Sequence, residues 1–266
     1  MLQKKILWGI VLFICVFILL NMSGTKTCNR IDTFQDIGTI PRIVHQQWWP
    51  DDHIPAPYDN LQKQTQAILY NYEYILWNLT SMRDLIKNHY AWFLPTYDAY
   101  KDDMYRGDAA RYFILYHYGG VYIDVDYVPQ VDIYKYLNPY YPTVLESPHW
   151  SGENVGTALM ASPPNHELWP YVFQALEIYK HEHVLKATGP QFLDKSLLMY
   201  PNADKIQLLP CKNFYRYPTG DWNKYVSKSE QVAREIHQYI PLKRHCGKIT
   251  DECLYGIHYS TVLWVK

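Results

Sequence analysis

The sequence predicts an α/β domain in which helices flank a mostly parallel sheet. Two observations lead to this prediction. From Ile40 onward, short apolar runs alternate with helical stretches, which is typical of chains that form strands and helices in turn. A Gly119-Gly120 pair separates the longest helical stretch from the strand-like run after it, and glycine is the usual stop signal of a helix. Ligands of such sheets bind beyond the carboxyl ends of the strands, so we expect the site there.

The expected elements alternate in chain order. The run Pro41–Gln46 predicts the first strand, Leu61–Leu69 a helix, and Tyr72–Trp77 a second strand. A second helix over Ser81–His89 has Ser81 in the position of an N-cap.

A third helix over Lys101–Tyr118 leads through the glycine pair into a strand over Val121–Asp126. In a strand, residues two apart point to the same side, so Asp124 and Asp126 are expected to face one pocket at the strand end. Two carboxylates at such a short distance repel each other unless a cation lies between them. Mg²⁺ and Mn²⁺ prefer such oxygen ligands, and they can bridge a diphosphate and stabilise it as a leaving group.

The long helix begins with a second charged pair. Asp108 and Arg111 are three residues apart and therefore share one helix face. The helix continues as Tyr112–Tyr116, which is too apolar for a freely exposed helix. A carboxylate–guanidinium pair at the start of such a helix can bind sugar hydroxyls and phosphate, and a local ion pair on a solvated face is the alternative.

The N-terminus predicts a membrane anchor. Lys4 and Lys5 precede the unbroken apolar run Ile6–Leu20, and the flanks extend it to a feasible span. A cleaved signal peptide is the alternative, but Asn21–Gly24 is a poor cleavage site. By the positive-inside rule, the lysines lie in the cytosol and the chain from about residue 25 lies in a lumen. We expect a cytosolic tip and signal anchor over 1–24, a stem over 25–39 and one catalytic domain over 40–266.

Composition narrows the class of protein. The chain has 266 residues and a formal charge of −1, from 25 basic and 26 acidic residues, which argues against a nucleic-acid binder. Hydrophobic residues make up 48%, enough for a folded core, and aromatic residues 16%. Tyrosine and tryptophan suit ligand-lined clefts, although compositional drift also explains such an excess.

The cysteines and one sequon agree with a lumen. Outside the apolar run there are four cysteines, which allow three pairings. The disulfide that we expect first joins Cys246 and Cys253. The alternative is that all four cysteines are unpaired thiols. Asn78 begins the sequon Asn-Leu-Thr.

The chemistry-bearing blocks resemble glycosyltransferase family 32, the group with a DXD sugar-binding region. That group includes Golgi α-mannosyltransferases and inositol-phosphoceramide mannosyltransferases. The resemblance covers roughly Ile40 to Trp264, and its most specific block runs from Asp108 to Asp126. The other matching blocks are Ile40–Trp48, Tyr74–Asn78 and Thr188–Pro190.

The resemblance implies a GT-A fold, a Rossmann-like mixed sheet flanked by helices. It also implies a nucleotide-sugar donor, Mn²⁺ or Mg²⁺, and retention of anomeric configuration. Asp124 and Asp126 would serve the metal and the ribose-diphosphate, while Asp108 and Arg111 would hold the donor sugar; these four are the expected catalytic residues. Members of the family end in a His followed by Ser-Trp. In this chain only the His is in place, as His258, and the resemblance implies that it is a metal ligand. Further residues expected around the donor are His45, Gln46, Trp48, Trp77 and Asn154. The resemblance also implies that the second strand reaches the cleft at Asn78, where a glycan would crowd the donor site, so we expect Asn78 to stay unmodified.

The resemblance favours GDP-mannose as donor and leaves UDP-sugars open, since relatives transfer galactose, glucose or N-acetylglucosamine. A glycan or glycolipid acceptor and a Golgi or ER membrane are expected. A non-catalytic sugar-binding protein of the same fold is one alternative. A metal phosphohydrolase is another, although it would need more clustered ligands. The oligomeric state is not predicted.

Overall fold

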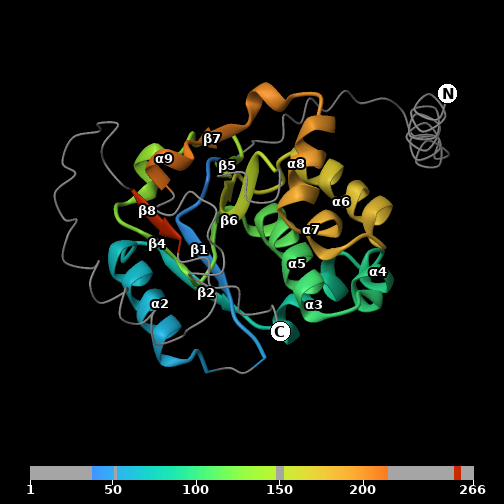
Figure 1. Cartoon of the computed structure of the whole chain (residues 1–266), viewed down its shortest axis with the longest axis horizontal. Helices are drawn as coiled ribbons and strands as arrows, with labels where there is room; N and C mark the ends of the chain where they lie inside the picture. Colours follow the sequence, from blue (N-terminus) through green and yellow to red (C-terminus); the bar gives the residue numbers. More distant parts are fainter. Residues whose placement is uncertain (1–37, 51–52, 148–152, 215–254, 259–266) are drawn as a thin grey trace, which may run out of the picture. The chain divides into compact units, whose positions relative to one another are not determined.

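A computed structural model of the chain describes residues 38–50, 53–147, 153–214 and 255–258, all of which lie in the compact unit Ile37–Lys266. A six-stranded sheet of order β2-β1-β3-β6-β5-β7 forms its centre (Figure 1). The strands are β1 Ile43–Gln47, β2 Glu73–Trp77, β3 Gly120–Ile123, β5 Thr143–Glu146, β6 Val155–Ser162 and β7 Gln207–Leu209.

The central sheet is mixed. Strand β1 pairs in parallel with β2 and β3, and β5 with β7, whereas β6 is antiparallel to both β3 and β5. The α/β prediction and the mixed sheet that the family resemblance implied are both confirmed, although the sheet is less parallel than the alternation of elements suggested. The reason lies in residues 147–154, which are too few for the crossover that a parallel connection from β5 to β6 would need.

A second, two-stranded sheet pairs the last described residues with the segment that follows the turn after β3. Strands β4 (Tyr127–Pro129) and β8 (Gly256–His258) pair antiparallel, with Tyr127 opposite His258. The Tyr127 hydroxyl donates to the Phe214 carbonyl at 3.0 Å, and the Tyr255 amide donates to the Asn213 carbonyl at 2.6 Å. These contacts fix β8 beside β4 from a distant part of the sequence.

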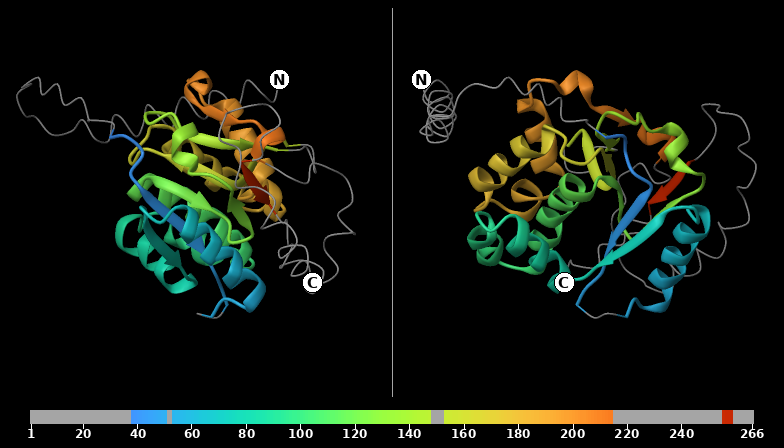
Figure 2. Two further views of the ribbon diagram at one scale, coloured as in Figure 1. Left: turned by 90° about the vertical axis from the view of Figure 1, so that its left-hand side faces the viewer. Right: turned by 180° about the vertical axis from the view of Figure 1, so that it is seen from behind.

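The helices divide between the two faces of the sheet (Figure 2). One face carries the larger core, in which Phe113 and Phe173 stack with ring centroids 4.0 Å apart. The opposite face packs against Leu69, Ile133 and Phe214. Helices on the first face are α3 Leu79–His89, α4 Leu94–Ala99, α5 Asp103–Tyr118, α6 Leu168–Tyr179, α7 Val184–Ala187 and α8 Pro190–Met199. The remaining ones are α2 Ala56–Ile68, α9 Cys211–Phe214 and two 3-10 turns, Ile133–Tyr136 and Ala203–Lys205.

The ends of the elements follow local chemistry. Helix α5 starts at an Asp102 N-cap and stops at Gly119, whose φ of 65° suits glycine. The N-cap of helix α3 lies three residues before the expected one, because Asn78 caps the helix and Ser81 completes a reciprocal capping box. Strand β3 ends at Ile123, so Asp124 to Asp126 form a turn rather than the expected strand end; the Tyr127 amide closes this turn on the Asp124 carbonyl at 2.9 Å.

Several expectations fall outside the described residues. These are the signal anchor over 1–24, nearly all of the stem over 25–39, and the cysteines Cys28, Cys246 and Cys253. In the ranges that the structure does describe, no helix is long and apolar enough to cross a membrane.

Candidate active site

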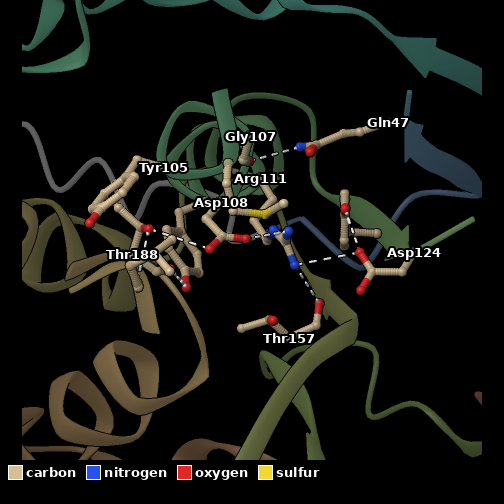
Figure 3. A network of polar contacts seen from close by, with 12 residues as sticks. Gln47, Tyr105, Gly107, Asp108, Arg111, Asp124, Thr157 and Thr188 are labelled. Atoms are coloured by element: carbon tan, nitrogen blue, oxygen red, sulfur yellow. Dashed lines mark hydrogen bonds and ion pairs between the residues drawn. The ribbon is translucent and has the colours of Figure 1, made fainter. Parts of the chain in front are cut away.

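Asp108 and Arg111 form a buried ion pair on α5. The Arg111 Nη2 lies 2.5 Å from Asp108 Oδ1, and the two residues are only 5% and 6% exposed. The second Asp108 oxygen accepts from the Thr188 hydroxyl at 3.3 Å, and the Thr188 carbonyl accepts from the Tyr112 hydroxyl at 2.7 Å. The three-residue spacing therefore places both charges together, and the turn before α8 holds them from the other side (Figure 3).

Arg111 also reaches across to the sheet. Its Nη1 donates to the Thr157 carbonyl on β6 at 3.2 Å and lies 3.5 Å from Asp124 Oδ1. Its guanidinium carbon lies 4.7 Å from the ring centroid of Tyr122, within the range of a cation–π contact. The buried Arg111 Nε has no hydrogen-bond partner among the described residues.

The start of α5 is anchored to the end of β1. The Gln47 amide donates to the Gly107 carbonyl at 3.1 Å (Figure 3). Any Cβ at Gly107 would overlap the Trp49 ring, so glycine permits this close approach. The helix that carries Asp108 and Arg111 is thereby held against the carboxyl end of the sheet.

Asp124, Asp126 and His258 form the metal-type cluster of the described residues. One ligand atom from each lies within 4.8 Å of the others, and His258 Nε2 lies 3.3 Å from Asp126 Oδ1. The turn after β3 supplies the carboxylates, and the β4–β8 register supplies the imidazole. The two carboxylates supply the oxygen ligands that Mg²⁺ and Mn²⁺ prefer, so these residues fit the expected cation.

Burial shifts the charges of the site. It raises the pKa of Asp108 to about 6, although Arg111 opposes the shift. It also raises the pKa of Asp124, again against the pull of Arg111. Burial alone would lower the pKa of His258, but the nearby Asp126 carboxylate outweighs it and the pKa is raised. In the protein without ligand, burial thus disfavours the negative form of the Asp124 carboxyl, and a cation beside it would favour that form.

Gln46 and Trp48 lie next to this cluster. The Gln46 amide donates to the Asp124 carbonyl at 3.4 Å, while its Oε1 accepts from the Tyr74 hydroxyl at 2.6 Å. The Trp48 ring lies 5.3 Å from that of Tyr58 and packs in the same small cluster as Val125. The strand end expected to shape a nucleotide pocket therefore borders the turn that carries the carboxylates.

His45 and Trp77 have their polar atoms engaged inside the protein. The Trp77 indole donates to His45 Nδ1 at 3.2 Å, and His45 Nε2 lies 2.9 Å from the Gly119 carbonyl. Because an indole N–H only donates, the His45 proton must sit on Nε2. Burial lowers the pKa of His45 to about 4, so the ring stays neutral. These side chains tie β1 to β2 and to the end of α5 beneath the site.

Asn154 lies at the start of β6 and contacts α8. Its amide nitrogen lies 3.2 and 3.0 Å from the two oxygens of Asp194. Asp194 was missed from the sequence, as were the contacts of Thr188 and Gln47, because nothing local marks residues that approach from another element. Tyr122 had a signal: it stands two residues before Asp124, and its hydroxyl donates to Asp124 Oδ1 at 2.7 Å.

Comparison with known proteins defines the class to which this fold and site belong. A family model described as the glycosyltransferase sugar-binding region containing DXD motif matches residues 55–144, which include the Asp108–Arg111 pair and the turn from Asp124 to Asp126. Inositol phosphoceramide mannosyltransferase 2 of Schizosaccharomyces pombe is 36% identical, over 86% of this chain and 70% of its own. The chain belongs to this DXD glycosyltransferase family, and it is an enzyme.

Other relatives point the same way. Mannosyl phosphorylinositol ceramide synthase SUR1 of Saccharomyces cerevisiae is 36% identical, over 58% of this chain and 41% of its own. Inositol phosphoceramide mannosyltransferase 1 of Schizosaccharomyces pombe is 27% identical, over 81% of this chain and 75% of its own. The chain thus spans well under half of one relative and about three quarters of another.

Among solved structures, the PaToxG glycosyltransferase aligns with 60% of this chain and 69% of its own, at 14% identity and a TM-score of 0.47. Mouse xyloside xylosyltransferase 1 aligns with 82% of this chain and 96% of its own, at 11% identity and a TM-score of 0.45. Both TM-scores lie below 0.5, and the fold is defined by the sheet order and register given above.

Proposed function

We propose that the protein is a metal-dependent, retaining mannosyltransferase of the GT-A type. GDP-mannose would be the donor and an inositol phosphoceramide the acceptor. The observation that carries the proposal is the line of buried charges from Asp108 through Arg111 to Asp124, which continues into the cluster with His258. A site for a charged diphosphate and a sugar needs such an arrangement. The mannosyl group and the acceptor are drawn from the names of the relatives.

Asp124, Asp126 and His258 would hold Mn²⁺ or Mg²⁺. When bound, the cation supplies positive charge that stabilises the diphosphate as it leaves. The protein supplies a second positive charge in Arg111, whose Nη1 lies 3.5 Å from Asp124 Oδ1 and would therefore lie near the same oxygens. Preorganised charge of this kind stabilises the transition state without reorganising during the reaction.

Asp108 and Arg111 would bind the donor sugar. Asp108 is fixed by Arg111 and Thr188, so its oxygens are positioned to accept from sugar hydroxyls. Asn154 would border the sugar from the β6 side, oriented by Asp194. Held at these points, the donor is presented in one orientation, which lowers the entropic part of the barrier.

The nucleotide would lie at the end of β1. Trp48 and Tyr58 offer an aromatic surface beside Val125, and Gln46 offers an amide next to the Asp124 carbonyl. His45 and Trp77 would support this pocket from below rather than by direct polar contact, because their nitrogens are already bonded.

Retention would come from a front-face displacement. The acceptor hydroxyl attacks the anomeric carbon from the face that the diphosphate leaves; the new C–O bond forms as the old one breaks. The hydroxyl proton passes to the departing diphosphate oxygen. Arg111 stays in contact with that oxygen and stabilises its growing charge. Asp108 and Asn154 keep the sugar in place through the step.

The Lys4-Lys5 flank and the apolar run Ile6–Leu20 support an anchored enzyme. We propose a single-pass type II protein of the Golgi or ER membrane, with an anchor over 1–24, a stem over 25–39 and a luminal catalytic domain over 40–266.

A donor panel tests the function directly. The full chain, purified in detergent, is incubated with GDP-mannose, UDP-galactose, UDP-glucose or UDP-N-acetylglucosamine and Mn²⁺, and released nucleoside diphosphate is measured. We expect GDP from GDP-mannose, and a mannosylated product when inositol phosphoceramide is added. A UDP-sugar as the only hydrolysed donor would overturn the mannosyl assignment while keeping the enzyme class.

A further inference from the structure

We propose that Tyr122 is a positioning residue that reserves one oxygen of Asp124 for the protein and leaves the other for a cation. This makes Tyr122 a determinant of metal specificity, favouring cations that take one oxygen from each carboxylate. The inference deepens the proposed function and rests on its metal site.

Two contacts converge on a single oxygen of Asp124. The Tyr122 hydroxyl donates to Asp124 Oδ1 at 2.7 Å, and Arg111 Nη1 lies 3.5 Å from the same atom. In Figure 3 both contacts end on one oxygen of the labelled Asp124 carboxylate, and the other oxygen points away from them. Asp124 Oδ1 therefore contacts the protein, whereas Asp124 Oδ2 is available to a ligand.

The tyrosine that makes this contact has little freedom to move. Tyr122 is 2% exposed and lies in β3, which is paired on both sides, with β1 and with β6. Its ring faces the Arg111 guanidinium at 4.7 Å. The Asp124 amide also donates to the Ala158 carbonyl of β6 at 2.8 Å. Backbone and Oδ1 are thus both fixed, so rotation of the carboxylate costs at least one hydrogen bond.

This restraint distinguishes between cations. Ca²⁺ takes six to eight oxygen ligands at about 2.3–2.6 Å and often binds both oxygens of a carboxylate. Mg²⁺ binds in a tight octahedron and takes one oxygen from each of one or two carboxylates. A carboxylate with Oδ1 already occupied suits the second mode. Without the Tyr122 hydroxyl, only the longer contact with Arg111 Nη1, at 3.5 Å, would still hold Oδ1, so Asp124 could turn both oxygens toward Ca²⁺ more easily.

The test compares direct metal binding in Tyr122→Phe and wild type. The variant keeps the ring beside Arg111 and removes only the hydroxyl. Binding of Mn²⁺ to the purified full chain is followed by the electron paramagnetic resonance signal of free Mn²⁺, without donor, and Ca²⁺ is added as competitor. We expect the ratio of Ca²⁺ to Mn²⁺ affinity to rise about tenfold in Tyr122→Phe.

Tyr72→Phe is the matched control. Its hydroxyl donates to Asp132 at 2.6 Å, so the variant also loses a tyrosine–aspartate hydrogen bond, but not one to the cluster. We expect its affinity ratio to equal that of wild type. A tenfold rise in Tyr122→Phe alone supports the inference, and an unchanged ratio in that variant overturns it.

Two further results separate the possible failures. If wild type and an Asp124→Asn, Asp126→Asn double variant bind Mn²⁺ equally, the metal site of the proposed function fails together with this inference. If Tyr122→Phe does not fold, a crystal structure of the Mn²⁺-loaded wild type decides: one Asp124 oxygen on the metal and Tyr122 on the other supports the inference, and both oxygens on the metal refutes it.

Discussion

Arg111 and Asp124 join the two halves of the site: Arg111 Nη1 lies 3.5 Å from Asp124 Oδ1. Arg111 belongs to α5 and pairs with Asp108, whereas Asp124 follows β3 and shares the cluster with Asp126. One guanidinium thus lies between the proposed sugar-binding carboxylate and the proposed metal-binding carboxylate. The sugar of a nucleotide-sugar donor would therefore contact Asp108 and its diphosphate would lie near Asp124, and the positions of these two carboxylates depend on each other through Arg111.

Asp124→Ala and Asp126→Ala should each abolish transfer while the protein stays folded. Each change removes a carboxylate that would hold the cation behind the leaving diphosphate. The loss should be worth several kcal/mol of barrier, or about a thousandfold or more in rate. Product formation is measured with saturating donor and Mn²⁺, and folding by circular dichroism. Near-normal turnover in both variants would refute the assignment of these residues.

Arg111→Lys should lower kcat/KM about a hundredfold. Lysine keeps the charge, but it lacks the planar fork that contacts Asp108, Asp124 and the Thr157 carbonyl together. The buried Asp108 would also lose its close partner, and a lone buried carboxylate is destabilising. Steady-state kinetics and thermal unfolding follow the two effects.

Arg83→Lys serves as the control for that change. Arg83 makes a two-point contact with Asp98 on the surface, at 2.8 and 2.7 Å, and lies outside the proposed site. Its variant should keep wild-type kcat/KM within about twofold. An equal loss in both variants would mean that Arg111 acts only through general stability.

The local part of the site could be predicted from the sequence. The three-residue spacing of Asp108 and Arg111 on a helix is enough to bring them together, because helical geometry depends on near neighbours. The two-residue spacing of Asp124 and Asp126 predicted their proximity, but for the wrong reason. The strand ends at Ile123, and a turn closed by Tyr127 brings the carboxylates together.

The long-range part could not be derived from local patterns. His258 reaches Asp126 only through the pairing of β8 with β4, and Thr188 reaches Asp108 only through the packing of the turn before α8. The family resemblance indicated His258, yet spacing alone gives no sign of either contact. Strand direction was also missed at β6, because alternating elements do not reveal a short antiparallel return.

Gly256→Ala should weaken Mn²⁺ binding about tenfold. A Cβ at Gly256 would overlap the Tyr127 hydroxyl, so β8 must shift away from β4. His258 lies in the same three-residue strand and would move from Asp126. A Mn²⁺ titration of the full chain measures the effect. Gly38→Ala is the control, since its nearest atom is the Pro164 Cγ at 4.0 Å; wild-type affinity in both variants would contradict the role of β8.

Asn78→Ala should cost about 1 kcal/mol of unfolding free energy, whereas Asn78→Asp should cost much less. The Asn78 side chain caps α3 by accepting from the Ser81 amide at 2.9 Å, and aspartate can make the same bond. Both variants remove the sequon. Because Asn78 is expected to be unmodified, neither should change the electrophoretic mobility of the protein. Equal destabilisation, or a mobility shift shared by both variants, would contradict this account.

His45 should make the fold less stable as the pH falls from about 6.5 to 4. Burial lowers the pKa of folded His45 to about 4, whereas the unfolded side chain keeps a pKa near 6.5. Between these values the unfolded state binds more protons, so the free energy of unfolding rises with pH and falls on acidification. The full shift corresponds to about 3 kcal/mol.

Denaturant unfolding at a series of pH values, in wild type and His45→Gln, measures this contribution. Glutamine has no titratable group, and its amide nitrogen can still donate to the Gly119 carbonyl that His45 contacts at 2.9 Å. The raised pKa of Asp108 acts in the opposite direction, because a folded state that holds its proton more tightly gains stability on acidification. That contribution is common to both proteins. The difference between the two curves should therefore narrow as the pH falls below 6.5, and parallel curves would show that folding does not lower the pKa of His45.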